Sequence, residues 1–237
     1  QQGLPFTIPV EQRAAYINEL MKAGFDVIDF GSFVSPKAIP QMAESDKVLE
    51  LIDKTKSNTK LLAIVGNVRG AVEAAEQSKV DIIGFPYSIS NTFLQRNINS
   101  SIEKVDDAAI QIGKVCSDNN KSFRVFISMA FGNPYGDEWN ESILNDAVKK
   151  LVGKGVQIIT LSDTIGLATA ASIKNIFEKL LPLYPGIELG LHLHTEKNNW
   201  REKIDSAWKA GCRSFDGVIN GIGGCPMTGY ELMGNLN

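Results

Sequence analysis

Short apolar runs alternate along almost the whole chain with longer amphipathic stretches. Apolar positions that run continuously or recur at every second residue predict buried strands, whereas a recurrence at every third or fourth residue predicts helices. The predicted strands span residues 25–30, 60–66, 80–86, 124–129, 156–162, 187–194 and 214–219. The predicted helices span residues 9–23, 41–55, 68–78, 101–119, 140–154, 168–182 and 199–210.

Glycines mark several boundaries between a predicted helix and the strand that follows it. Gly24, Gly155 and Gly211 each lie just past a helix end, the position at which glycine commonly terminates a helix. A repeated order of helix, glycine and strand predicts parallel strands joined by helices. Seven such strands favour the α/β class, as a single (β/α)₈ TIM-barrel catalytic domain over residues 1–237, rather than an open doubly wound sheet. A closed barrel has eight strands, so we expect the first strand before Gln1 and the last helix after Asn237.

Composition narrows the class of partner. The 237 residues are 43% hydrophobic and 22% charged, with a net charge of -3, which is typical of a soluble globular protein with one sizeable core. Lysine and arginine are scattered rather than clustered, so the charge pattern of a nucleic-acid-binding protein is absent. No apolar run reaches the roughly 18 residues that span a membrane. Three cysteines without CxxC spacing indicate a reducing compartment, and we expect a cytoplasmic protein.

The two histidines are the first candidate for chemistry. His192 and His194 are the only histidines of the chain and lie two apart at the end of an apolar run, so on a strand both imidazoles leave the same face. Two converging neutral imidazoles suit a divalent metal, although hydrogen-bonded core histidines have the same pattern. Because chemistry in a barrel collects at the carboxyl ends of the strands, this position favours metal ligands.

Other polar residues follow predicted strands. Asp163 in "TLSDTIG" is compatible with a metal ligand, an acceptor that orients an imidazole, or a helix N-cap. After the last predicted strand, Gly223 and Gly224 permit a tight turn whose backbone N–H groups approach an anion. Cys225 follows them and is either a proton-transfer thiol or a small apolar plug.

Six motifs occur in the order and spacing of a known enzyme family. The stretches "FGSFVSPKAIPQM", "RNINSSIE", "FGNPYGD", "LSDTIG", "HLH" and "GIGGCP", the last followed by a GN dipeptide, run from Gly3 to Asn235. Together they resemble the 3-hydroxy-3-methylglutaryl-CoA lyase family, which is related to the isopropylmalate and homocitrate synthases. The resemblance implies a metal-dependent barrel that cleaves a carbon–carbon bond of an acyl-CoA, and a homodimer.

The resemblance also implies roles for individual residues. It makes His192, His194 and Asn235 ligands of Mg²⁺ or Mn²⁺ and Cys225 the proton-transfer residue. Asp29, which falls where the family has a glutamate, and Asp163 are the other catalytic candidates. The expected substrate-binding residues are Ser32, Ser162, Thr164, Gly223 and Gly224. The arginine and aspartate of the family pattern would precede "QGLP", and Thr195 follows the second histidine where the family often has aspartate.

Two other functions remain open at this stage. A related enzyme that condenses acetyl-CoA with an oxo acid shares the HxH motif, and a non-catalytic relative that binds a metabolite would keep the same fold. The leading hypothesis is cleavage of 3-hydroxy-3-methylglutaryl-CoA, or of a close 3-hydroxyacyl-CoA, to acetyl-CoA and acetoacetate, with an acyl-CoA as partner and neither nucleic acid nor membrane involved.

Overall fold

A computed structural model describes residues 4, 6–195, 199–221 and 234–236. The chain divides into two compact units. Unit 1 comprises Gln1–Phe85 and Ile110–Phe123, and unit 2 comprises Pro86–Ala109 and Arg124–Asn237. That residues 1–237 form a single catalytic domain stays a prediction. No helix in the described ranges is both long and apolar enough to cross a membrane.

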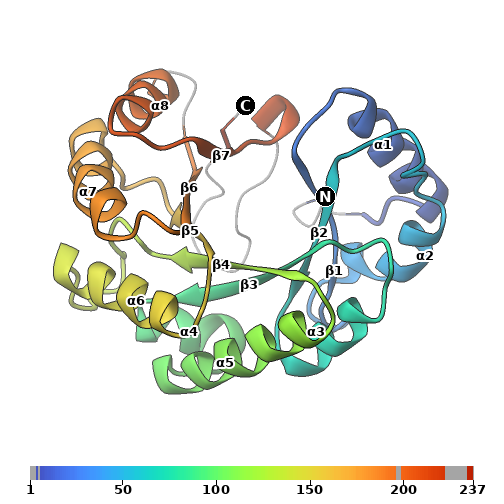
Figure 1. Ribbon diagram of the computed structural model, residues 1–237, viewed down its shortest axis with the longest axis horizontal. Coiled ribbons are helices and arrows are strands. Elements are labelled where there is room, and N and C mark those ends of the chain that lie inside the picture. Colours follow the sequence, from blue (N-terminus) through green and yellow to red (C-terminus); the bar gives the residue numbers. More distant parts are fainter. Residues whose placement is uncertain (1–3, 5, 196–198, 222–233, 237) are drawn as a thin grey trace. The chain divides into compact units, whose positions relative to one another are not determined.

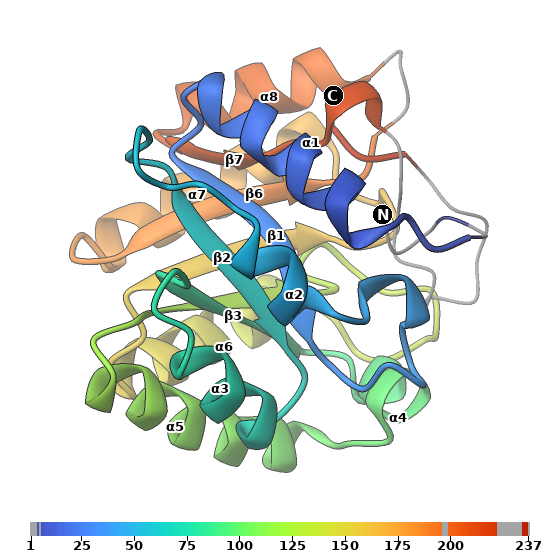
Figure 2. The same ribbon diagram turned by 90° about the vertical axis from the view of Figure 1, so that its right-hand side faces the viewer.

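Unit 1 is built on parallel strands with helices packed against them. Its elements are α1 (Val10–Lys22), β1 (Val27–Phe33), the 3₁₀ helix η1 (Pro40–Met42), α2 (Ser45–Glu50), β2 (Lys60–Val65), α3 (Val68–Ala75), the start of β3 (Ile82–Ser88), the end of α5 (Ile102–Asp118) and the start of β4 (Ser122–Ser128). β1 pairs with β2 and β2 with β3, both in parallel. α1 and α2 contact each other and β1, as Figure 2 shows.

Unit 2 continues the alternation of helix and strand. Its elements are α4 (Asn91–Ile98), part of α5 (Ile102–Asp118), β4 (Ser122–Ser128), α6 (Glu141–Gly153), β5 (Ile158–Asp163), α7 (Ala170–Leu183), β6 (Glu188–Leu193), α8 (Trp200–Lys209), β7 (Ser214–Asp216) and the 3₁₀ helix η2 (Ile219–Gly221). The strands from β4 to β7 pair in chain order, all in parallel. Figure 1 shows α6, α7 and α8 along one side of these strands.

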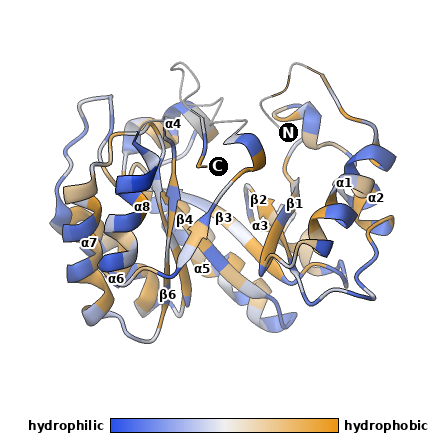
Figure 3. Cartoon of the chain, turned by 90° about the horizontal axis from the view of Figure 1, so that it is seen from above, coloured by the Kyte–Doolittle hydropathy of each residue, from blue (hydrophilic) through white to orange (hydrophobic). Residues whose placement is uncertain are grey.

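The two faces of the unit 2 strands differ in polarity. Residues paired in register share a face, and successive residues alternate between faces. One face carries the fully buried Leu161 and Leu191, against which helices such as α6 turn an apolar stripe (Figure 3). That stripe consists of Leu144, Ala147, Val148 and Leu151, and each buried leucine contributes roughly 1.5–3 kcal/mol. The other face carries Thr160 and His192, so the polar chemistry lies on the side away from the helices.

Most elements lie where the sequence predicts them. All seven predicted strands are present, and Gly24, Gly155 and Gly211 have φ angles of 79°, 85° and 102°, which confirms the left-handed helix ends that glycine favours.

Three segments differ from the sequence-based expectation. The helix expected over 41–55 forms only η1 and α2, because Glu44, with φ of 61°, interrupts the helical backbone. The strand expected over 214–219 ends at Asp216, before η2. α4 lies where the pattern predicts no helix, and the Ser90 side chain caps it by accepting a hydrogen bond from the Phe93 N–H at 3.1 Å.

Gly70, in the first turn of α3, offers a test of packing in unit 1. A Cβ at this position would lie 2.3 Å from the Phe33 carbonyl oxygen, so we expect Gly70→Ala to lower the free energy of unfolding by about 1–3 kcal/mol. Gly153 is the matched control, because its added Cβ would meet nothing within 4 Å and alanine favours a helix by up to about 1 kcal/mol. Urea denaturation measures both, and equal stability of the two variants would contradict the expectation.

Candidate metal centre

The two histidines lie together at the carboxyl end of β6. Their ring centroids are 5.2 Å apart and the ring planes meet at 68°. His194 is buried, whereas the His192 side chain is 28% exposed. The prediction that both imidazoles share a face is therefore confirmed.

Each imidazole is held through its Nδ1 atom. His194 Nδ1 lies 2.8 Å from the Asp163 carbonyl oxygen. A carbonyl oxygen only accepts hydrogen bonds, so Nδ1 carries the proton and Nε2 keeps its lone pair. Burial, assisted by the neighbouring His192, lowers the pKa of His194 to about 4, and His194 is neutral at pH 7. His192 Nδ1 lies 3.3 Å from Asp216 Oδ2, an arrangement that likewise leaves Nε2 for a ligand.

The carboxylate that holds His192 is itself held by Arg124 from β4. Arg124 Nη2 donates to Asp216 Oδ1 at 2.9 Å, and Arg124 Nε donates to Thr160 Oγ1 at 2.8 Å. Burial alone would raise the pKa of Asp216, but the hydrogen bond with His192 and the charge of Arg124 outweigh it and hold that pKa below its usual value. Asp216 is consequently ionised and accepts the His192 proton donor.

Gly190 explains how Arg124 reaches across the strands. A Cβ on Gly190 would lie 3.1 Å from Ser214 Oγ and 3.3 Å from Arg124 Nη2, both tighter than ordinary contact. The glycine of "LGLHLH" thus leaves room on β6 for a guanidinium that starts on β4 and ends at β7.

Asp163 makes contacts through its side chain and through its backbone carbonyl oxygen. Its register partner is Leu193, so its side chain points away from the imidazoles while its carbonyl oxygen holds His194. Oδ1 accepts a hydrogen bond from the Ala168 N–H at 3.0 Å, and Oδ2 lies 3.7 Å from Lys203 Nζ. Burial raises the pKa of Asp163, and these partners oppose the rise. The contacts fit the orienting acceptor, and a direct catalytic role for Asp163 stays a prediction.

The structure describes three further predicted residues of unit 2. Ser162 is the register partner of His192, and Thr164 Oγ1 accepts a hydrogen bond from the Met129 N–H at 2.8 Å. Asn235 forms an antiparallel bridge with His194. The backbone of the GN dipeptide is therefore beside the second histidine.

The other predicted residues belong to unit 1 or lie outside the described residues. Asp29 and Ser32 belong to β1 in unit 1, where Asp29 is exposed and the Ser32 N–H donates to Ser45 Oγ at 3.1 Å. Gly223, Gly224 and Cys225 lie outside the described residues. Across the described ranges, no group of three or more His, Cys, Asp and Glu side chains is arranged to hold a metal ion.

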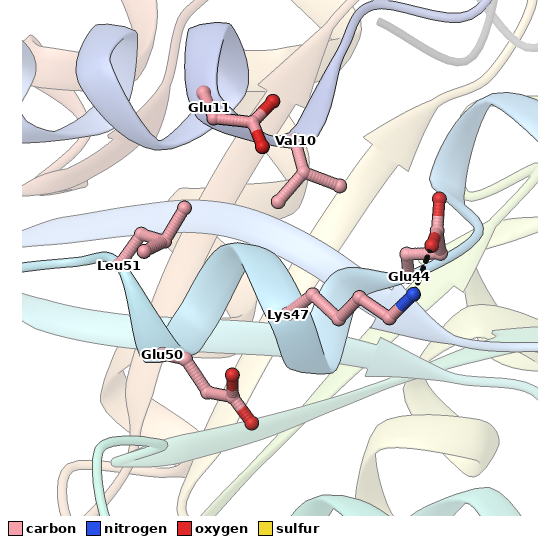
Figure 4. Close-up of a pocket in the computed structure, with 6 residues that line it drawn as sticks. All are labelled: Val10, Glu11, Glu44, Lys47, Glu50 and Leu51. Atoms are coloured by element: carbon pink, nitrogen blue, oxygen red, sulfur yellow. Dashed lines mark hydrogen bonds and ion pairs between the residues drawn. The ribbon is translucent and has the colours of Figure 1, made fainter.

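A hollow between α1 and α2 does not coincide with the predicted site. It is open to solvent and contains none of the predicted site residues. Figure 4 shows its lining, which consists of Val10, Glu11, Glu44, Lys47, Glu50 and Leu51.

Four residues that the sequence reasoning missed complete the surroundings of the histidines. They are Arg124, Thr160, Lys203 and Asp216. Arg124 and Asp216 are charged residues inside runs that predict strands, which is the signal that could have found them. Lys203 precedes the buried Ala207 by one helical turn, a position that an apolar residue usually occupies.

Comparisons of the sequence with protein families and with known proteins identify the same family. The family model described as HMGL-like matches residues 1–237. The chain is 31% identical to the hydroxymethylglutaryl-CoA lyase YngG of Bacillus subtilis, over 95% of this chain and 75% of the relative. It is 30% identical to the human cytoplasmic 3-hydroxy-3-methylglutaryl-CoA lyase, over 92% of this chain, and spans only 59% of that protein's length.

Solved structures show the same similarity. A Bacillus subtilis HMG-CoA lyase matches 99% of this chain and 78% of its own, with a TM-score of 0.91 at 30% identity. An Acinetobacter baumannii HMG-CoA lyase in complex with coenzyme A and 3-methylmalate matches 100% and 77%, with a TM-score of 0.91 at 28% identity. These matches confirm the predicted TIM-barrel class.

The pair of Arg124 and Asp216 can be tested by a double-mutant cycle. Breaking a fully buried ion pair costs about 3–5 kcal/mol, and the Asp216 side chain is 23% exposed. We therefore expect Arg124→Met and Asp216→Asn each to destabilise by less than this amount and the double variant to lose much less than their sum. The control cycle uses the exposed pair of Lys114 and Asp118 on α5, for which we expect a coupling of about 0.5 kcal/mol or less. Additive losses at Arg124 and Asp216 in urea denaturation would contradict the assigned pair.

Proposed function

Because the chain belongs to the HMGL-like family, we propose that it is a carbon–carbon lyase that cleaves 3-hydroxy-3-methylglutaryl-CoA, or a close 3-hydroxyacyl-CoA. The observation that carries the proposal is the pair of anchored imidazoles at the end of β6, whose Nδ1 atoms are both engaged. The named relatives act on this substrate, and a structural neighbour binds coenzyme A. The products are acetyl-CoA and acetoacetate.

The donor set fits a divalent cation. His194 is neutral with its Nε2 lone pair unprotonated, His192 is oriented in the same way, and Asn235 is next to His194 in the backbone. Nitrogen donors together with amide and water oxygens suit Mg²⁺ or Mn²⁺ better than a closed zinc site. We propose that His192, His194 and Asn235 hold such an ion, which when bound would make the tertiary hydroxyl of the substrate more acidic.

The proposed reaction is a retro-Claisen cleavage. A base takes the proton of the 3-hydroxyl, the electrons of that O–H bond form the ketone of acetoacetate, and the electrons of the breaking C–C bond form the enolate of acetyl-CoA. The enolate carbon then takes a proton from an acid. The proposed catalytic residues are Asp29, Asp163 and Cys225, of which Cys225 is the proposed acid. The proposed substrate contacts are Ser32, Ser162, Thr164, Gly223 and Gly224.

Two further properties belong to the proposal. The cysteine pattern supports a cytoplasmic protein, and the family resemblance supports a homodimer.

The product of the reaction tests the function. We expect the protein with 3-hydroxy-3-methylglutaryl-CoA and Mn²⁺ to release equal amounts of acetyl-CoA and acetoacetate, and EDTA to abolish the release because the hydroxyl then keeps its ordinary acidity. His192→Ala with His194→Ala is the matched control and should be inactive with metal present. Absence of acetoacetate would overturn the proposal, and consumption of acetyl-CoA with a 2-oxo acid would identify a condensing enzyme instead.

A pair of cysteine variants tests the proton donor. We expect Cys225→Ser to lower kcat by a factor on the order of 10² to 10⁴, because a hydroxyl is a far weaker acid than a thiol. Cys116→Ser is the control, since Cys116 is buried in α5 and its substitution should leave kcat nearly unchanged while lowering the thermal midpoint. Normal turnover by Cys225→Ser would show that this thiol only packs.

A further inference from the structure

Lys203 is a buried lysine that the proposed reaction does not use. It lies on α8 and its side chain is only 4% exposed. The ammonium lies 3.7 Å from Asp163 Oδ2, and the Asp163 side chain is 1% exposed. Burying an ammonium and a carboxylate carries a large desolvation penalty, and an apolar pair of similar size would often be at least as stable. Fold stability alone is therefore a weak explanation for this pair.

The side of the strands on which Lys203 lies limits what it can do. Asp163 pairs in register with Leu193, whereas His192 pairs with Ser162. Register partners share a face, so the Asp163 carboxylate and the Lys203 ammonium lie on the helix side, opposite His192. Lys203 is thus behind the strands and acts on the imidazole side only through another residue.

Asp163 is that residue. Its Oδ2 atom has no hydrogen-bond partner among the described residues, so the ammonium is the charge that holds this oxygen. Its Oδ1 atom accepts a hydrogen bond from the Ala168 N–H, and its carbonyl oxygen accepts one from His194 Nδ1. The same carbonyl oxygen accepts a hydrogen bond from the Gly166 N–H at 3.3 Å. The carboxylate, through Ala168, and the carbonyl, through Gly166, thus hold the same turn, and the position of the carboxylate bears on the carbonyl that selects the His194 tautomer.

We propose that Lys203 is a positioning residue for His194, which acts by holding the Asp163 carboxylate so that the Asp163 carbonyl oxygen keeps the His194 proton on Nδ1. The inference builds on the metal site of the proposed function. Without the ammonium, Oδ2 loses its counter-charge and the carboxylate turns, the carbonyl follows, and the proton of His194 redistributes between Nδ1 and Nε2. A proton on Nε2 blocks metal binding by that nitrogen.

The tautomer of His194 tests the proposal in metal-free protein without substrate. We expect ¹⁵N NMR of histidine-labelled protein to show the Nδ1–H form in the unmodified chain and a raised fraction of the Nε2–H form in Lys203→Met. We expect the Mn²⁺ dissociation constant of Lys203→Met to rise about 10- to 100-fold, as for other residues that orient a ligand. Lys203→Arg keeps the charge and should stay within about threefold of the unmodified protein.

Lys154 provides the matched control in the same unit. Its Nζ atom lies 3.5 Å from Asp106 Oδ1, and its side chain is 21% exposed. Lys154→Met should lower the thermal midpoint while leaving the His194 tautomer and the Mn²⁺ affinity unchanged. If Lys203→Met does not fold, Lys203→Gln replaces it with the same two measurements and the same expected direction.

An unchanged tautomer and unchanged Mn²⁺ affinity in the Lys203 variants would overturn the proposal, whatever happens to stability. Failure of the proposed function has a different signature. A protein that releases no acetoacetate but changes its His194 tautomer in Lys203→Met keeps the positioning role and loses only the reaction.

Discussion

An imidazole nitrogen binds a cation only when it carries no proton, so the tautomer of each histidine decides which nitrogen is available. This constraint explains the surroundings of His192 and His194, because a free imidazole exchanges its proton between two nitrogens. Each Nδ1 atom has an acceptor, a carboxylate for His192 and a backbone carbonyl for His194. The two acceptors differ in charge, and the groups around each acceptor differ accordingly.

The carboxylate acceptor requires a counter-charge, whereas the carbonyl acceptor requires a fixed backbone. Arg124 supplies the counter-charge to Asp216 and is itself held by Thr160. On the opposite side of the strands, the Asp163 carboxylate contacts the Ala168 N–H and the Lys203 ammonium. Buried charge therefore occurs on both faces, while the remaining positions of the helix side are apolar. The fold provides the apolar packing, and the charged groups lie around the two imidazoles.

The sequence predicts the features that depend on the spacing of residues within one helix or strand. Alternation along a strand places both histidines on one face, and glycines after helices reveal where strands begin. The contact between Arg124 and Asp216 joins residues 92 apart in the chain and depends on the register of four strands, which no local pattern contains. Lys203 lies on the same face of α8 as the buried Ala207, and its partner, Asp163, is 40 residues earlier in the chain, a contact that no local pattern contains.

Asp163 shows a different limit of sequence reasoning. A cap, an orienting acceptor and a metal ligand are alternatives when a residue is treated as one group. The structure separates the residue into two groups, a side chain that binds the Ala168 N–H and a carbonyl oxygen that orients His194. The capping alternative is wrong, because the N-cap of α7 is Thr169, and the acceptor that holds His194 is the backbone carbonyl of Asp163 rather than its side chain.

The missing side chain of Gly190 also constrains how this sequence can drift over evolution. The space above Gly190 is filled by the guanidinium of Arg124, a residue from two strands away. A larger residue at position 190 requires Ser214 and Arg124 to shift, and a shift of Arg124 disturbs its contact with Asp216. The three positions therefore form one evolutionary unit, and relatives that replace one of them should replace the others as well.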